Sequence, residues 1–166
     1  PLSFRRGPAM KNRFMLAPLT NQQSHADGVL SDDEFRWLTM RAEGGFGLTM
    51  TCAASVQDGG QGFPGQLGAH DDRHIPGLAR LASALRAQQT HAVLQLHHAG
   101  MRSPSALIGR QPLCPSANAE TNARAMTLAE IEQTRDDFIA AARRCERAGF
   151  DGVQLHGAHG YLLCQF

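Results

Sequence analysis

The chain has 166 residues, of which 42% are hydrophobic and 19% are charged, as is typical of one ordinary globular domain. Its 16 Lys and Arg against 15 Asp and Glu leave a net charge of +1, so nothing favours nucleic acid or an anionic membrane as a partner. No apolar run approaches the roughly 20 residues of a membrane span. The first residues, PLSFRRGPAMKNRF, lack the apolar core of a signal peptide.

The four cysteines favour a protein with reduced thiols. Cys52, Cys114, Cys145 and Cys164 are widely spaced and form no CxxC pair, which argues against a zinc ribbon or a redox dithiol. Widely spaced cysteines without a signal peptide favour reduced thiols. We therefore expect a cytoplasmic protein without a disulfide framework.

The first half of the chain alternates between predicted strands and helices. Residues 13–20, RFMLAPLT, form a short apolar strand that Pro18 ends, because proline cannot donate to a ladder. A helix follows Ser31, which is a predicted N-cap with Glu34 completing a capping box, and it closes at Gly44. Residues 47–56 form the second strand, and the glycine-rich residues after it predict a loop.

The second half repeats the alternation. Residues 75–88 predict a helix, with Leu78, Leu81, Ala82 and Leu85 at helical spacing, and residues 91–100 predict a strand that breaks into a loop. The Pro- and Ser-rich residues 101–126 predict a long irregular insertion. Residues 127–149 predict the longest helix, with a second capping box, and residues 150–157 the fourth strand.

This order predicts a parallel sheet with right-handed crossovers, either doubly wound or part of a barrel. A dinucleotide-binding fold needs GxGxxG on the first strand-to-helix turn, and APLTNQQSHADG has no such pattern. We therefore favour an α/β TIM (β/α)8 barrel. A whole barrel takes about 250 residues, so we expect residues 1–166 to be the N-terminal part of one barrel domain, with about four strands and three helices.

Polar groups gather at the predicted carboxyl ends of the strands, where α/β barrels place their sites. These ends read APLT, CAAS, QLHHAG and HGAHGY. Together with KNRFMLAPLT, DGVLSDDEFRWLTMRAEGGFGL and AGFDGVQLHGAHGYLLCQF, they closely resemble the Old Yellow Enzyme family of FMN-dependent ene-reductases. The resemblance covers nearly the whole chain. It implies a TIM barrel with FMN at the carboxyl ends of the strands and NADH or NADPH as hydride donor.

The same resemblance implies flavin contacts. The segment Ala17-Pro18-Leu19-Thr20 would lie against the flavin, with Thr20 bonding its O4/N5 edge. The backbone of Ala53 would meet that edge, and Gln95 would read the pyrimidine side of the ring. The implied cofactor-binding residues are thus Pro18, Leu19, Thr20, Ala53, Gln95 and His156.

The resemblance also implies catalytic roles for His156, His159 and Tyr161. The two histidines would bind the carbonyl oxygen of an α,β-unsaturated carbonyl substrate, and Tyr161 would donate the proton. The chemistry is coherent, because hydride transfer from flavin N5 to the β-carbon builds negative charge on that oxygen. Two imidazole N–H donors would then form an oxyanion hole, and a positioned phenol would act as general acid.

The sequence departs from the family pattern at two places. Asn21 and Gln22 follow the flavin-edge residue where some relatives carry a substrate-contacting tyrosine, and Cys52 stands where many relatives have Glu. Two other interpretations of the chain stay open. One is a catalytically inactive half-barrel that self-associates through its open strand edges. The other is a metal-dependent barrel enzyme, with His156 and His159 joined by His97 or His98 as ligands.

Overall fold

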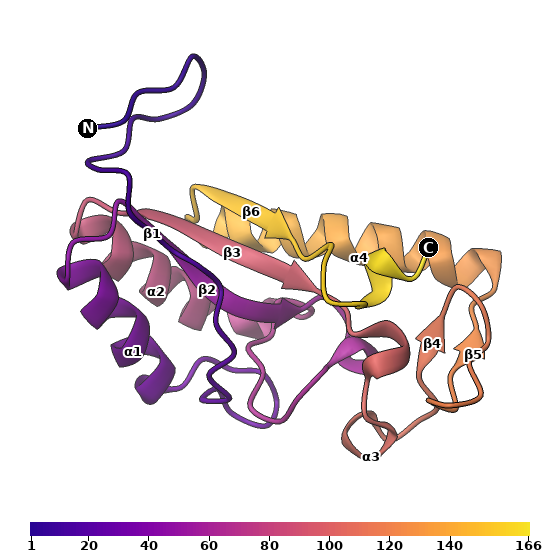
Figure 1. Cartoon of the computed structure of the whole chain (residues 1–166). Coiled ribbons are helices and arrows are strands. Elements are labelled where there is room, and N and C mark those ends of the chain that lie inside the picture. The colour runs from indigo at the N-terminus through magenta and orange to yellow at the C-terminus, as the bar shows by residue number, and fades with distance from the viewer.

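The computed structural model describes all of residues 1–166 and is organised around one parallel sheet (Figure 1). Neighbouring strands of this sheet follow one another in chain order and pair in parallel, which confirms the predicted strand pairing. The strands in spatial order are β1 (Met15–Leu16), β2 (Leu48–Ser55), β3 (His91–His97) and β6 (Gly152–Leu155).

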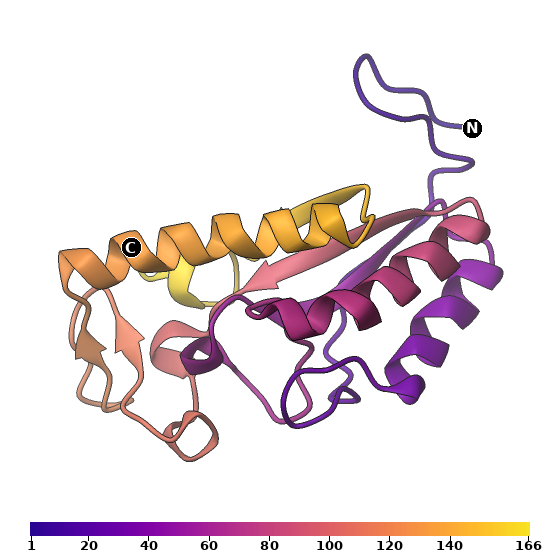
Figure 2. The same cartoon turned by 180° about the vertical axis from the view of Figure 1, so that it is seen from behind.

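The three long helices are α1 (Asp32–Glu43), α2 (Ile75–Ala87) and α4 (Leu128–Arg147). All three cover the same face of the sheet, as the two opposite views show (Figures 1 and 2). A doubly wound fold would place helices on both faces, whereas successive right-handed crossovers in a barrel place them all outside. The arrangement therefore favours the predicted barrel segment over the doubly wound alternative.

The first predicted strand is much shorter than its apolar run suggests. Only Met15 and Leu16 pair with β2, and the ladder ends before Pro18, which has no N–H to donate. Phe14 and Met15 are largely exposed, so most of the predicted strand lies outside the core. The residues after Leu16 are thereby free to run as a loop over the carboxyl end of the sheet.

The insertion between β3 and α4 is more ordered than predicted. The expectation of a wholly irregular segment is wrong, because two short strands pair in parallel through Leu113 with Arg124 and Cys114 with Ala125. This segment contains a 3-10 turn, a short helix and the small second sheet: η3 (Gly100–Arg102), α3 (Ser105–Ile108), β4 (Leu113–Cys114) and β5 (Arg124–Ala125).

The helix caps show one confirmed prediction and one wrong one. Thr127 and Glu130 form the predicted capping box at the start of α4. Ser31 caps α1 by accepting from the backbone N–H of Glu34, as expected. The Glu34 side chain, however, does not turn back to Ser31. It is fully buried, and its carboxyl group accepts hydrogen bonds from the core instead.

The hydrophobic core lies between the sheet and the helices. The predicted helix positions Leu78, Leu81, Ala82 and Leu85 are all buried in it, against Leu94 and other residues of β3. Burying a leucine side chain stabilises the fold by roughly 1.5–3 kcal/mol. The opposite face of the sheet is left free of helices. No helix of the chain is both long and apolar enough to cross a membrane.

Candidate active site

A cavity of about 580 Å³ opens at the carboxyl ends of the sheet strands. Residues from the loop after β1, from β2, β3 and β6, and from the turn after β6 line it together. The carboxyl edge of a parallel α/β sheet is where such folds bind ligands. The lining residues are Ala17, Pro18, Thr20, Ala53, Phe63, Gln95, Gln154, Leu155, His156, Gly157, Ala158, His159 and Tyr161.

The cavity gathers nearly all of the residues expected at the site. The flavin-edge candidates Pro18, Thr20, Ala53 and Gln95 share it with the three candidate catalytic residues. Leu19 does not line the cavity and is 52% exposed, so the structure does not bring it together with the others. The grouping joins four segments that lie far apart in the sequence.

His156, His159 and Tyr161 form a cluster of three rings. The ring centroid of His156 lies 5.2 Å from that of His159 and 4.9 Å from that of Tyr161, and both contacts are edge to face. His159 and Gly160 both have positive φ angles, of 59° and 66°. A left-handed His is uncommon and costs free energy. This turn brings the His159 ring back towards His156 instead of continuing the direction of the strand.

The surroundings of His156 favour its neutral imidazole form. Burial lowers the pKa of His156, and the neighbouring His159 lowers it further. A neutral imidazole carries one N–H donor and one acceptor nitrogen. The Nδ1 of His156 is close to the backbone N–H of Ala158, at 3.3 Å, and can accept from it. The Nε2–H would then be left to donate into the cavity.

Gln95 is held by a neighbour that sequence reasoning missed. Its Nε2 donates to Oε1 of Gln154 over 2.7 Å, so the two amides form a polar pair on adjacent strands. Gln154 stands in the middle of an otherwise apolar strand, and that interruption was the available signal. Phe63, in the glycine-rich loop after β2, was also missed, and its signal was an aromatic residue among glycines.

Arg102 also approaches the ring cluster. Its guanidinium lies 5.0 Å from the centroid of the Tyr161 ring, and its Nη1 donates to the backbone carbonyl of His159. This places a cation against the phenol ring, within the usual range of a cation–π contact. Sequence reasoning missed it, because an arginine in an irregular loop carries no signal of its own.

The adjacent histidines at the end of β3 point to different surroundings. His97 packs against Tyr161, with ring centroids 4.4 Å apart. The Nε2 of His98 lies 2.9 Å from Oε1 of Gln57 on the other side, and burial lowers its pKa to about 4. No group of three or more His, Cys, Asp or Glu side chains is arranged to hold a metal ion. The geometry therefore gives no support to the metal-dependent alternative.

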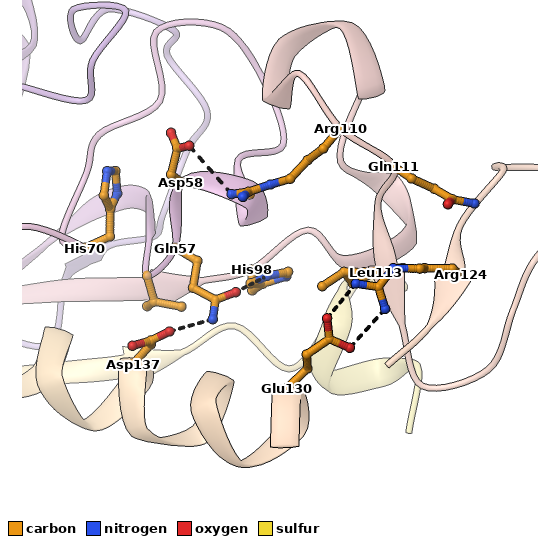
Figure 3. Close-up of a pocket in the computed structure, with 12 residues that line it drawn as sticks. Gln57, Asp58, His70, His98, Arg110, Gln111, Leu113, Arg124, Glu130 and Asp137 are labelled. Atoms are coloured by element: carbon orange, nitrogen blue, oxygen red, sulfur yellow. Dashed lines mark hydrogen bonds and ion pairs between the residues drawn. The ribbon is translucent and has the colours of Figure 1, made fainter. Parts of the chain in front are cut away.

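A second cavity, of about 690 Å³, lies behind His98 (Figure 3). It is strongly polar, yet its charged groups are paired with one another. Arg124 forms a bidentate pair with Glu130, which lowers the pKa of that carboxyl to about 2, and Arg110 lies 3.6 Å from Asp58. These pairs connect the insertion to α4 and to the loop after β2. They hold these segments together around the second cavity.

A parallel α/β barrel segment with a polar cavity and ring cluster at its carboxyl edge is the architecture of a barrel enzyme that binds its ligand at that edge. The whole chain, residues 1–166, matches the NADH:flavin oxidoreductase / NADH oxidase family, and it belongs to this family. It is 41% identical to the probable NADH-dependent flavin oxidoreductase YqiG of Bacillus subtilis over 170 residues, which cover all of this chain and 45% of that protein. It is 37% identical to the NADH:fumarate oxidoreductase of Klebsiella pneumoniae, over 18% of that protein.

Solved structures agree with this assignment. The Old Yellow Enzyme homologue from Zymomonas mobilis is 34% identical and superposes with a TM-score of 0.85, covering 92% of this chain and 46% of that one. Morphinone reductase is 27% identical with a TM-score of 0.84, covering 93% of this chain and 46% of that one. The chain thus spans less than half the length of these relatives. Its fold is the N-terminal part of their barrel.

The family implies FMN as cofactor, with NADH or NADPH as electron donor. The residues present fit one side of a flavin. The cavity is of a size typical for small-molecule sites, and it combines apolar walls at Ala17 and Pro18 with the amide pair of Gln95 and Gln154. The small side chain of Ala53 lets a flat ring approach the strand. Its carbonyl accepts from Gln66 over 3.0 Å, which leaves that oxygen engaged.

Proposed function

We propose that the chain supplies the substrate-activating half of an ene-reductase, an enzyme that reduces the activated C=C bond of α,β-unsaturated carbonyl compounds. FMN, when bound, supplies hydride transfer between NADH or NADPH and the alkene. Pro18, Thr20, Ala53 and Gln95 would hold its ring, with Leu19 beside them. The observation that carries the proposal is the joint presence of these residues and the His156, His159 and Tyr161 cluster in one cavity.

His156 and His159 would bind the carbonyl oxygen of the substrate. As the β-carbon receives a hydride, negative charge moves onto this oxygen, and two preorganised N–H donors stabilise it. The lowered pKa of His156 keeps its ring neutral near pH 7, so the ring remains a fixed donor that does not exchange its charge state. His156 would also lie against the flavin, because it lines the same cavity as Gln95.

Tyr161 would deliver the proton to the α-carbon. It stands at the end of the turn after β6, directly before the 3-10 turn η4 (Leu162–Cys164), beside both histidines, and lines the same cavity. A phenol placed there acts as general acid in a step that otherwise needs water. Its ring is held on its edges and faces by His97, His156 and Arg102. The product carbonyl compound would then leave with a saturated α–β bond.

The experiment is anaerobic spectroscopy of the purified chain supplied with FMN. We expect a yellow protein whose colour is bleached by NADPH or NADH and restored by 2-cyclohexenone. Tyr161→Phe should keep the bleaching rate and slow the restoration by at least about 100-fold, which is the usual scale of a lost general acid. An exposed histidine that does not line the cavity, changed as His25→Ala, is the control and should change neither rate. A Tyr161→Phe variant that restores colour at the wild-type rate would overturn the proposed role.

A further inference from the structure

One buried polar atom next to the ring cluster has no partner. His97, at the carboxyl end of β3, is fully buried, and its Nε2 is buried without any hydrogen bond. A buried donor or acceptor without a partner costs roughly 1–3 kcal/mol, so such atoms are rare and call for a reason. The other ring nitrogen, Nδ1, lies 3.0 Å from Nε2 of Gln66.

The Gln66 amide decides which nitrogen of His97 carries the proton. Its Oε1 accepts from the backbone N–H of Gly62 over 2.7 Å, and its Nε2 donates to the carbonyl of Ala53 over 3.0 Å. Turning the amide over would break both bonds, so its NH₂ group must face His97. An amide NH₂ can only donate, and Nδ1 of His97 is therefore the acceptor.

A neutral imidazole that accepts at Nδ1 carries its hydrogen at Nε2. Burial, together with the nearby His156 and His98, lowers the pKa of His97 to about 3, so the ring is neutral near pH 7. The unpartnered Nε2 of His97 is thus an N–H donor at every working pH. Gln66 sets this tautomer, and because the ring is fully buried, solvent does not contact it.

The ring of Tyr161 lies nearer to His97 than that of His156 does. Tyr161 packs edge to face on His97, with centroids 4.4 Å apart and ring planes at 82°. His156 is more distant, at 5.3 Å. A Cβ atom at Gly62 would lie 3.2 Å from Cε1 of His97, so the loop after β2 closes on the ring from a further side. An N–H donor directed at an aromatic face is a recognised weak hydrogen bond.

We propose that His97 is a positioning residue for Tyr161, whose ring it holds through an N–H···π contact from a tautomer that Gln66 dictates. This inference rests on the proposed role of Tyr161 as proton donor. Through Gln66 it connects two parts of the site, because the same amide holds the carbonyl of Ala53 on the strand beside the flavin position. The hydroxyl of Tyr161 would then keep a constant orientation relative to that strand.

The tautomer is tested by NMR on the wild-type chain labelled with ¹⁵N in its histidines. Long-range ¹H–¹⁵N spectra should show the His97 imidazole in the Nε2–H form, without titration between pH 5 and 8. His98, whose pKa is lowered to about 4, should also not titrate in this range, so His97→Phe assigns the His97 signals by removing them. Gln66→Leu should release the ring into a tautomer mixture, whereas Gln111→Leu, an exposed glutamine elsewhere, should not. An Nδ1–H form, or titration within this range, overturns the proposal whether or not the protein is an ene-reductase.

The positioning role is tested by comparing two substitutions in the FMN-loaded protein. His97→Phe keeps an aromatic ring without a donor, and His97→Gln keeps an N–H near the former Nε2. We expect the return of the yellow colour with 2-cyclohexenone to slow about tenfold in His97→Phe and less than threefold in His97→Gln. The rate of bleaching by NADPH should be unchanged in both variants. Equal losses in the two variants, or none, contradict the proposal. A wild-type protein that fails to reduce the enone contradicts the proposed function instead, and the NMR result still decides the tautomer.

Discussion

The Sγ of Cys52 donates a hydrogen bond to Oε1 of Glu34 over 2.8 Å, joining β2 to α1 inside the core. The same carboxyl group accepts from Nδ2 of Asn21 over 3.2 Å and from the hydroxyl of Ser24. Cys52 is one of the positions where the sequence departs from the family pattern, and Asn21 is another. Both departures therefore meet at one buried carboxyl group, just behind the loop that carries Thr20.

Replacing Glu34 should destabilise the chain strongly. Glu34→Ala removes a fully buried side chain and leaves the donors of Ser24 and Cys52 without a partner. We expect the free energy of unfolding to fall by about 3 kcal/mol, measured by urea denaturation. Glu43→Ala, at an exposed position of the same helix, is the control and should change it by less than about 0.5 kcal/mol. Equal effects of the two substitutions would contradict the role of the buried carboxyl.

The thiols should differ sharply in reactivity. Cys164 is exposed, whereas the other three cysteines are buried. Burial raises the pKa of Cys145 to about 12 and, together with Glu34, raises that of Cys52 well above its usual range. Because the thiolate is the reactive form, we expect Ellman's reagent to label one thiol rapidly in the folded chain and four after unfolding. Cys164→Ser should abolish the rapid phase, and any rapid labelling that remains would contradict the burial of the others.

Stability should fall on mild acidification because of two buried histidines. The pKa values of His97 and His98 are lowered to about 3 and about 4, against 6.5 for an unperturbed side chain. As the pH falls below about 6.5, the unfolded chain binds these protons before the folded chain does, so folding becomes less favourable. At pH 5 the loss is about 2 kcal/mol for each histidine relative to pH 7.5.

Urea denaturation at the two pH values measures this difference. His98→Gln removes one of the two groups and should reduce the pH-dependent loss by about 2 kcal/mol. His25→Gln, at an exposed histidine, should leave the loss unchanged. A His98→Gln variant with the full pH dependence would show that other groups are responsible.

The chain of residues 1–166 should self-associate. Leu155 and Phe166 are 57% and 67% exposed, and they line an apolar groove with Phe138 and Ile139 of α4, next to the free edge of β6. Contiguous apolar surface and an unpaired strand edge both favour contact with another chain. We expect analytical ultracentrifugation to show concentration-dependent association that Leu155→Arg weakens, while Leu128→Arg, also exposed but outside the groove, does not. A strictly monomeric wild-type chain would contradict this prediction.

Much of the fold was predictable from local patterns. The apolar spacing of Leu78, Leu81 and Leu85 identified α2, and the Thr127 capping box located the start of α4. These signals are local, because helical periodicity and caps depend on residues three or four apart. The pairing in the insertion was not predictable. Its two-residue strands at Leu113 and Arg124 are too short to show any periodicity.

The sequence by itself determined the long helices, the order of the main strands, and which strand ends carry polar side chains, because these depend on short-range spacing and on family motifs. Only the tertiary structure decided which of those side chains meet. Glu34 has the spacing of a capping residue, yet its carboxyl group turns inward because Ser24 and Cys52 offer it buried donors. His97 and His98 are indistinguishable as neighbours in a motif. The twist and pairing of β3 send one ring to Tyr161 and the other to Gln57, since successive side chains of a strand leave it on opposite faces.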